Sequence, residues 1–159
     1  MKPLLVVMGR VAFWLGWPLW RIILAQGSRA RVLMVYKNEV LLEKSFLGTG
    51  RWGLPGGGRK STEEPRAAAI REVREETGIR LTAEELQALG SWQTQFYGLR
   101  YKADYFAVKL SERPPLQPQP LEIVELVWLP LEKIKPQHIH PSVQEALDQY
   151  GRGIMDTAE

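Results

Sequence analysis

Residues 57–79 read Gly-Gly-Arg-Lys-Ser-Thr-Glu-Glu-Pro-Arg-Ala-Ala-Ala-Ile-Arg-Glu-Val-Arg-Glu-Glu-Thr-Gly-Ile, and this stretch decides how the rest of the chain is interpreted. Pro65 suits the first position of a helix, where its missing N–H is not needed. The residues that follow are mostly good helix formers, and Gly78 supplies the left-handed residue that commonly ends a helix. The stretch therefore predicts a helix over Pro65–Thr77.

Three carboxylates share one face of this predicted helix. Glu72, Glu75 and Glu76 follow the spacing i, i+3, i+4, while Ile70 and Val73 lie on a neighbouring face that we expect to meet the core. Like charges in one arc repel each other unless a cation lies among them, and carboxylate oxygens are the usual ligands of hard cations such as Mg²⁺. Taken alone, the pattern is just as typical of a solvated acidic helix face.

A glycine-rich segment comes just before the helix. Residues 52–58 read Trp-Gly-Leu-Pro-Gly-Gly-Gly. Where side chains are absent, backbone groups can approach phosphate oxygens or a metal ion closely. The position of this segment, ahead of an acidic helix, favours a cation site over a solvated face.

With these residues in place, the chain resembles the Nudix hydrolase superfamily (MutT-like proteins), whose signature is G-x5-E-x7-R-E-U-x-E-E-x-G-U, with U a bulky aliphatic residue. The resemblance implies an α/β fold, an α/β/α sandwich with a mixed β-sheet. It also implies a hydrolase that cleaves the diphosphate linkage of a nucleoside diphosphate joined to another moiety, with Mg²⁺ as cofactor and Mn²⁺ as a substitute. All nine specified positions are filled, by Gly57, Glu63, Arg71, Glu72, Val73, Glu75, Glu76, Gly78 and Ile79.

The resemblance also assigns a metal site. Glu75 and Glu76 are the implied metal ligands, and Glu72 is a ligand or the general base. The backbone carbonyl of Gly56, just before the signature, completes the set of metal ligands. A carboxylate held by the helix can take the proton of the attacking water.

Many superfamily members use a further acidic residue from outside the signature. Glu125 precedes Trp128 by three residues, a spacing like that of the corresponding strand in relatives, and Glu122 is the close alternative. The general base is therefore Glu72, Glu122 or Glu125, and a surface glutamate on an edge strand is the competing interpretation for the last two. Arg71 is expected to act in catalysis by orienting a neighbouring carboxylate through a charge-assisted hydrogen bond.

Substrate contacts are expected near the start of the quoted stretch. Gly57, Gly58, Arg59 and Lys60 could contact phosphate, although a solvated role is as common for the two cations. Tyr97 lies near the position where dinucleoside polyphosphate hydrolases carry a tyrosine.

The composition is that of one soluble domain of 159 residues, with 45% hydrophobic and 25% charged residues,. The absence of cysteine excludes disulfides and thiolate metal sites. The formal net charge of +3 would help to attract phosphorylated anions. We therefore expect a nucleotide-like small-molecule diphosphate as the partner, and no nucleic acid.

Residues 1–26 form an apolar extension, a helix or an arm, ahead of a hydrolase domain over residues 27–159. Arg10 lies in the middle of the apolar run and Pro18 would kink a helix there, which argues against a membrane-spanning helix. No small-x-small cleavage site follows, as a signal peptide would require. We therefore expect a cytoplasmic protein.

The role of the extension stays open between two alternatives. Arg10 and Arg21 are three helical turns apart, so one helix would carry both on one face. Such a helix could pack on the domain or on a second subunit in a homodimer. It could equally lie in a membrane interface, which would make the protein peripheral at the membrane.

The other segments are assigned by periodicity and by turn residues. The loop over residues 111–120 contains four prolines, which cannot sustain a sheet ladder,. The predicted elements are strands over 31–37 and 40–43 with a turn at 38–39, a hairpin over 90–97 and 99–110, a last strand over 123–129, and a helix over 141–150.

The signature leaves the substrate open. Nucleoside triphosphates, ADP-ribose-like compounds and dinucleoside polyphosphates are all compatible with it. The alternative function is a non-catalytic nucleotide-binding sensor on the same fold. The complete set of glutamates favours an enzyme, because a sensor would not need every carboxylate.

Overall fold

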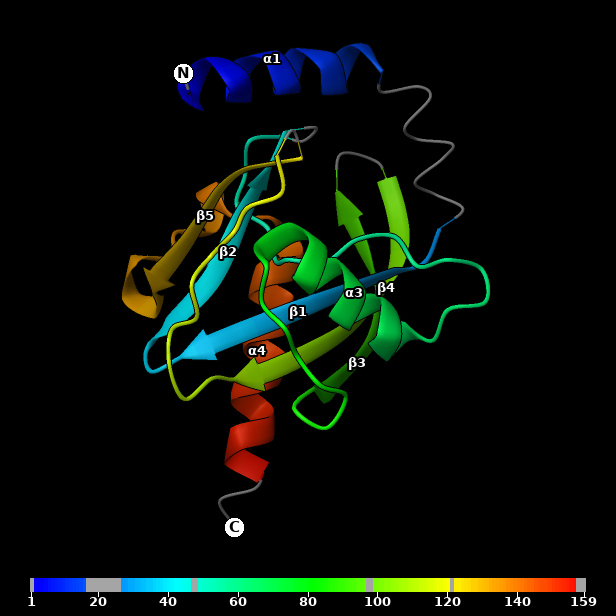
Figure 1. Cartoon of the computed structure of the whole chain (residues 1–159), viewed down its shortest axis with the longest axis vertical. Helices are drawn as coiled ribbons and strands as arrows, with labels where there is room; N and C mark the ends of the chain where they lie inside the picture. The colour runs from blue at the N-terminus through cyan, green and yellow to red at the C-terminus, as the bar shows by residue number, and fades with distance from the viewer. Residues whose placement is uncertain (1, 17–26, 47–48, 97–98, 121, 157–159) are drawn as a thin grey trace.

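A five-stranded mixed sheet lies at the centre of the computed structural model, which describes residues 2–16, 27–46, 49–96, 99–120 and 122–156 (Figure 1). The strand order is β3-β4-β1-β2-β5. Strands β1 and β4 are parallel, and the other neighbouring pairs are antiparallel. The strands are β1 (Arg29–Tyr36), β2 (Glu39–Ser45), β3 (Gln87–Phe96), β4 (Leu99–Lys109) and β5 (Ile123–Pro130).

Helices cover both faces of the sheet. Helix α3 (Pro65–Thr77) packs on one face, where Ala68, Ala69 and Val73 join the core. Helix α4 (Pro141–Asp156) packs on the other face, with two 3₁₀ turns (Leu131–Lys133 and Pro136–His138) ahead of it. Because β1 and β2 are covered on both sides, their apolar residues form nearly continuous runs. The predicted α/β/α sandwich with a mixed sheet is confirmed.

Helix α3 begins and ends at the predicted residues. Pro65 is at its start, and Gly78 follows its end with φ 77° and donates its N–H to the carbonyl of Arg74. These two signals are local, so the sequence alone sets the ends of the helix and therefore the orientation of its acidic face.

Strands β1 and β2 form a hairpin only beside their turn. Their ladder is limited to Val35–Val40 and Tyr36–Glu39. The turn falls one residue earlier than predicted, and its Lys37 has φ 51°, a positive value of the kind that tight hairpin turns require.

Beyond the turn the two strands separate, and the segment 53–57 lies between them. Val32 donates its N–H to the carbonyl of Pro55, and Glu43 exchanges two backbone hydrogen bonds with Gly53. Gly56 has φ 131°, and a side chain there would collide with the carbonyl of Ala30. The glycine-rich segment thus takes the place of the missing ladder, and only glycine fits at residue 56.

Some element ends differ from the prediction. Strand β3 starts at Gln87 instead of residue 90, because pairing with β4 continues through a bulge between Ala88 and Gly90. Helix α4 continues to Asp156. The predicted hairpin turn near Gly98 lies outside the described residues.

Helix α1 (Lys2–Leu15) lies at the top of Figure 1 and contacts β5. Phe13 is buried, and Gly9 approaches the carbonyl of Phe46 so closely that a side chain would not fit. The helix ends at Leu15. Arg21, which was expected to share one helix with Arg10, lies outside the described residues. Within the described part of the chain, no helix has the length and apolar character needed to cross a membrane.

Candidate active site

Two carboxylates of α3 lie directly against the glycine-rich segment. Glu76 is only 4% exposed, and its Oε2 accepts a hydrogen bond of 2.6 Å from the N–H of Gly56. The carboxylate of Glu72 lies so close to Gly57 that a side chain on residue 57 would overlap it. The absence of side chains at these two glycines is what allows the backbone and the carboxylates to meet.

Arg71 holds the outer part of the same acidic face. Its Nε and Nη2 each donate to Glu63 at 2.8 Å, and its Nη1 donates to Glu72 at 2.6 Å and to Glu75 at 3.2 Å. The hydrogen bond from Arg71 is the main reason why the pKa of Glu63 falls to about 2. Arg71 therefore contacts the carboxylate that it was expected to orient, and Glu63 anchors Arg71.

A second arginine, Arg31 of β1, is hydrogen-bonded to the backbone of the glycine-rich segment. Arg31 donates from Nη1 to the carbonyl of Leu54 at 2.8 Å and to the carbonyl of Gly56. The same Nη1 lies 3.5 Å from Oε1 of Glu43, whose side chain is 3% exposed. Burial, and then the neighbouring carboxyl of Glu76, raise the pKa of Glu43 well above its ordinary value. Burial likewise raises the pKa of Glu76, although Arg31 and the N–H of Gly56 oppose that rise.

Neither Glu43 nor Arg31 was predicted from the sequence. Glu43 ends the apolar run Val-Leu-Leu of β2, where an acid reads as the polar end of a strand. The available signal was the burial expected of both faces of β2, since an acid on a strand covered on both sides must face a specific partner.

Glu125 and Glu122, the two further acids expected from outside the signature, lie in different places relative to the acidic face of α3. Glu125 pairs with Lys44 across the β2–β5 ladder, and its Oε2 lies 3.6 Å from Nζ of Lys44. Because side chains alternate along a strand, these two point to the face of α4, whereas Glu43 points to the face of α3. Glu122 is exposed, but it is close enough to Glu43 to influence that residue's pKa.

The expected substrate contacts are only partly assembled. Arg59 lies 3.7 Å from Asp104, measured from Nη1 to Oδ2. Lys60 and Gly58 are exposed beside the glycine-rich segment. Tyr97 lies outside the described residues.

A cationic cluster that the sequence did not reveal lies near the same segment. The guanidinium of Arg29 stands over the ring of Tyr101, with Cζ 5.1 Å from the ring centroid. Burial, followed by the charges of Arg31, Arg29 and Arg51, lowers the pKa of His140 to about 3. Three guanidinium groups around a neutral imidazole create a positive potential that suits phosphate groups.

The donor chemistry of this region fits a hard divalent cation. Glu72, Glu75 and Glu76 supply carboxylate oxygens, which are the preferred ligands of Mg²⁺. Within the described ranges, no three Asp, Glu, His or Cys side chains are already gathered as a metal cage. Arg71 forms ion pairs with two of these three carboxylates, those of Glu72 and Glu75.

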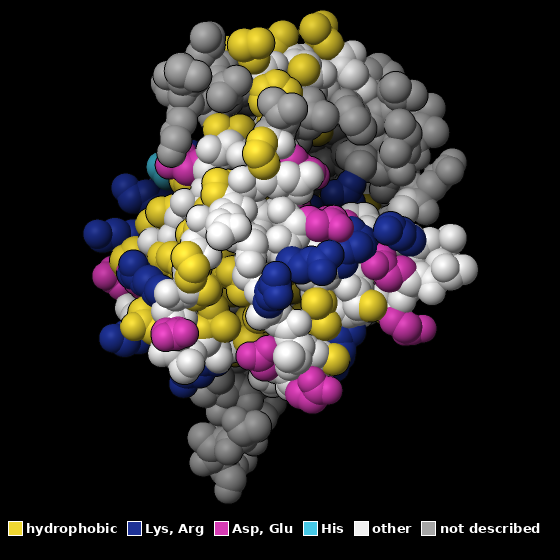
Figure 2. Space-filling model, in the orientation of Figure 1, with side chains coloured by type: hydrophobic (Ala, Val, Ile, Leu, Met, Phe, Trp, Pro, Cys, Tyr) yellow, Lys and Arg dark blue, Asp and Glu magenta, His cyan; other side chains and the backbone are white. Residues whose placement is uncertain are grey.

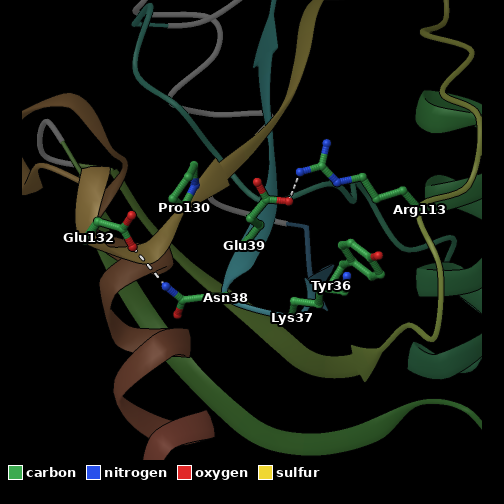
Figure 3. Close-up of a pocket in the computed structure, with 7 residues that line it drawn as sticks. All are labelled: Tyr36, Lys37, Asn38, Glu39, Arg113, Pro130 and Glu132. Atoms are coloured by element: carbon green, nitrogen blue, oxygen red, sulfur yellow. Dashed lines mark hydrogen bonds and ion pairs between the residues drawn. The ribbon is translucent and has the colours of Figure 1, made fainter.

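A separate surface pocket of about 540 Å³ lies at the other end of the sheet (Figure 3). Residues of the β1–β2 turn line this pocket. Two pairs of side chains lie in it: Arg113 forms an ion pair with Glu39, and the amide of Asn38 donates to Glu132 at 2.9 Å. Tyr36 is six residues along β1 from Ala30, which corresponds to roughly 20 Å at the rise of a strand. This pocket is therefore distinct from the acidic site at the glycine-rich segment.

Comparison with known proteins gives one consistent result. A family model described as the NUDIX domain matches residues 21–150. Nudix hydrolase 10 of Arabidopsis thaliana is 40% identical over 116 residues, which cover 70% of this chain and 40% of that protein. The chain spans about two fifths of the length of the first curated relatives it matches.

Two further similarities concern the signature region and the fold. Diphosphoinositol polyphosphate phosphohydrolase 3-alpha of Mus musculus is 50% identical over 44 residues, which cover 28% of this chain and 27% of that protein. The crystal structure of a MutT NUDIX hydrolase from Burkholderia pseudomallei superposes with a TM-score of 0.68 at 25% identity. The superposed region covers 77% of this chain and 96% of the Burkholderia pseudomallei chain.

Proposed function

Because the chain belongs to the NUDIX family, we propose that it is a divalent-metal-dependent pyrophosphohydrolase acting on a nucleoside diphosphate linked to another moiety. The observation that carries this proposal is the contact of Glu72 and Glu76 with Gly57 and Gly56. This contact places the acidic face of α3 directly beside the backbone of the glycine-rich segment, which can approach phosphate closely. A purely structural acidic helix would have no reason to bury Glu76 against a glycine N–H.

The proposed metal ligands are the carbonyl of Gly56 and the carboxylates of Glu75 and Glu76, with Mg²⁺ as the cation and Mn²⁺ as its substitute. The carbonyl oxygen of Gly56 has a second lone pair beside the one that Arg31 engages. When bound, the cation supplies neutralisation of the diphosphate charge and lowers the pKa of a water molecule.

The chain's own residues set the geometry of the attack. We assign the general base to Glu72, because Glu125 points to the opposite face of the sheet. One oxygen of Glu72 is held by Arg71, and the other faces Gly57, where it can accept the proton of the attacking water,. Arg71 is a positioning residue in this scheme, and Arg31 fixes the glycine-rich segment.

The proposed substrate carries more negative charge than the scissile diphosphate alone. Arg29, Arg31 and Arg51 surround His140 near the glycine-rich segment, and Gly58, Arg59 and Lys60 border it. Phosphate oxygens are the anions that such guanidinium groups bind with the best geometry. A nucleotide-like diphosphate is proposed first, and a diphosphoinositol polyphosphate belongs in the same test because of the similarity in the signature region.

Turnover of a substrate panel tests the proposed function. With Mg²⁺ we expect release of phosphate-containing product from at least one of nucleoside triphosphates, ADP-ribose, dinucleoside polyphosphates and a diphosphoinositol polyphosphate. Product release should stop with excess chelator and return with Mn²⁺. Nucleotide binding without any hydrolysis across the panel would instead support the non-catalytic sensor.

We also propose that residues 1–26 are accessory to a hydrolase domain over 27–159, and that α1 rests on an anionic lipid surface at the cytoplasmic face of a membrane. Gly9 and Phe13 turn one side of α1 to the domain. The other side presents apolar side chains to solvent (Figure 2). No Asp or Glu precedes Glu39 in the chain, and the cations of this region would favour an anionic surface by about 1 kcal/mol each. The exposed apolar residues of α1 are Val7, Met8, Val11, Trp14 and Leu15.

Vesicle binding tests the lipid contact. The full chain should sediment with vesicles that contain phosphatidylglycerol, and Val11→Asp with Leu15→Asp should reduce the bound fraction at least about tenfold, because two apolar side chains lose their burial. Leu131→Asp, which changes an exposed leucine outside α1, should bind like the wild type. A dimer that the double substitution dissociates, without any binding to vesicles, would show that α1 covers a second copy instead.

A further inference from the structure

Glu43 is a buried carboxylate that the proposed mechanism does not use. It lies on β2 and is 2% exposed, and its backbone is bonded to Gly53 of the glycine-rich segment. Its side chain lies beside Arg31, which also donates to the carbonyl of Gly56, and Glu76 accepts from the N–H of the same Gly56. The two carboxyls are close enough to influence each other's pKa. Two carboxylates from different elements, β2 and α3, therefore lie close together behind the segment that carries Gly56.

One oxygen of this buried pair of carboxyls has no partner. Arg31 is the one cation within 4.0 Å of either carboxylate in the described part of the chain, and it approaches only Oε1 of Glu43, at 3.5 Å. Oε2 of Glu43 is buried and has no hydrogen-bond partner. Two carboxyls therefore share one guanidinium, and Oε2 of Glu43 is the buried oxygen that is left unsatisfied, which is costly in the absence of a further partner.

We propose that Glu43 is an additional ligand of the divalent cation held by α3, with its free Oε2 turned to the cation beside Glu76. This inference rests on the proposed function, since it adds a residue to the metal site proposed there. It replaces Glu125 as the acid from outside the signature. Carboxylate oxygen is the donor that Mg²⁺ and Mn²⁺ prefer, and a cation between Glu43 and Glu76 removes the repulsion between them.

Arg31 does not make such a ligand unnecessary. Its Nη1 is already shared among Glu43 and the carbonyls of Leu54 and Gly56. The guanidinium thus fixes the carboxylate of Glu43 and the glycine-rich segment in one arrangement. Preorganisation of this kind favours metal binding, because the ligands lose little freedom when the cation enters.

The test is Mn²⁺ affinity of the full-length protein without substrate, measured by calorimetry. Glutamine has the shape of glutamic acid without its charge, so Glu43→Gln removes the ligand and keeps the packing. We expect Glu43→Gln to weaken Mn²⁺ binding about tenfold or more, while circular dichroism shows that the metal-free protein stays folded. Glu39→Gln is the matched control, because Glu39 lies on the same strand and pairs with Arg113 at its far end.

Two variants separate this inference from the function on which it rests. If Glu76→Gln loses Mn²⁺ binding while Glu43→Gln keeps wild-type affinity, the role of Glu43 is overturned and the proposed function stands. If neither variant changes the affinity, the metal site of α3 is wrong, and the role of Glu43 falls with it. Should Glu43→Gln fail to fold, Glu43→Asp is measured instead. It keeps the charge but withdraws the carboxylate by one methylene group, and it too should weaken Mn²⁺ binding.

Discussion

Glu76→Gln is expected to abolish diphosphate hydrolysis while the protein stays folded. The glutamine oxygen can still accept the hydrogen bond from Gly56 that Glu76 accepts now, and a neutral amide is easier to bury than a carboxylate. Only the charge that would hold the cation is lost. If that charge supplies several kcal/mol to the transition state, turnover should fall roughly a thousandfold or more.

The measurement is kcat on the best substrate of the panel at saturating Mg²⁺, with circular dichroism to confirm the fold. Glu64→Gln is the control. Glu64 is exposed, stands at the N-terminus of α3 and makes no capping hydrogen bond there. Wild-type turnover in Glu76→Gln would rule out the metal-site assignment.

Arg31→Met is expected to cause the largest loss of stability. Methionine keeps much of the apolar stem but leaves Glu43 without its ion pair and takes the shared donor from the carbonyls of Leu54 and Gly56. Breaking a buried pair by removing one partner typically costs about 3–5 kcal/mol. The free energy of unfolding in urea should fall by that order.

The stability that Arg31→Met loses should also depend on pH, and the direction of this dependence follows from the pKa values of Glu43 and Glu76. Arg31 lowers the folded-state pKa of both Glu43 and Glu76, against a burial effect that raises it. Without Arg31 these pKa values rise further. A carboxyl whose folded-state pKa is raised contributes stability below its unfolded pKa, near 4.5, and loses that contribution as the pH rises. The difference between wild type and variant should therefore be larger at pH 8 than at pH 5.

Arg113→Met is the matched control for this loss. Arg113 forms an ion pair with Glu39 on the surface, where its side chain is 48% exposed. Surface pairs contribute about 0–1 kcal/mol, with little change between the two pH values. Equal losses for the two variants would mean that the contacts of Arg31 do not hold the glycine-rich segment.

The parts of the fold that depend on neighbours in sequence could be predicted. Helix α3 ends where Pro65 and Gly78 place its ends, because both act through local backbone geometry,. The loop over 111–120 follows in the same way from its four prolines,. What could not be predicted is the separation of β1 from β2, since it depends on hydrogen bonds to residues ten or more positions away in sequence.

The same distinction between local and long-range features applies to the candidate site. Glu72, Glu75 and Glu76 belong to one helix, so their spacing is enough to group them. The face on which Glu125 lies depends on the β2–β5 register, in which it opposes Lys44. The closeness of Glu43 and Glu76 depends on how α3 sits over β2. Neither relation follows from the spacing of residues that are neighbours in sequence.

The position of the glycine-rich segment between β1 and β2 also limits where residues can be inserted into this protein. Surface loops usually accept insertions readily. The segment 53–57 cannot, because its backbone groups bond to β1 on one side and to β2 on the other. An added residue would shift that pairing and move Gly56 away from Ala30. The proline-rich loop over 111–120 carries no such double ladder, so added residues should be tolerated better there than in the segment 53–57, whose length stays fixed.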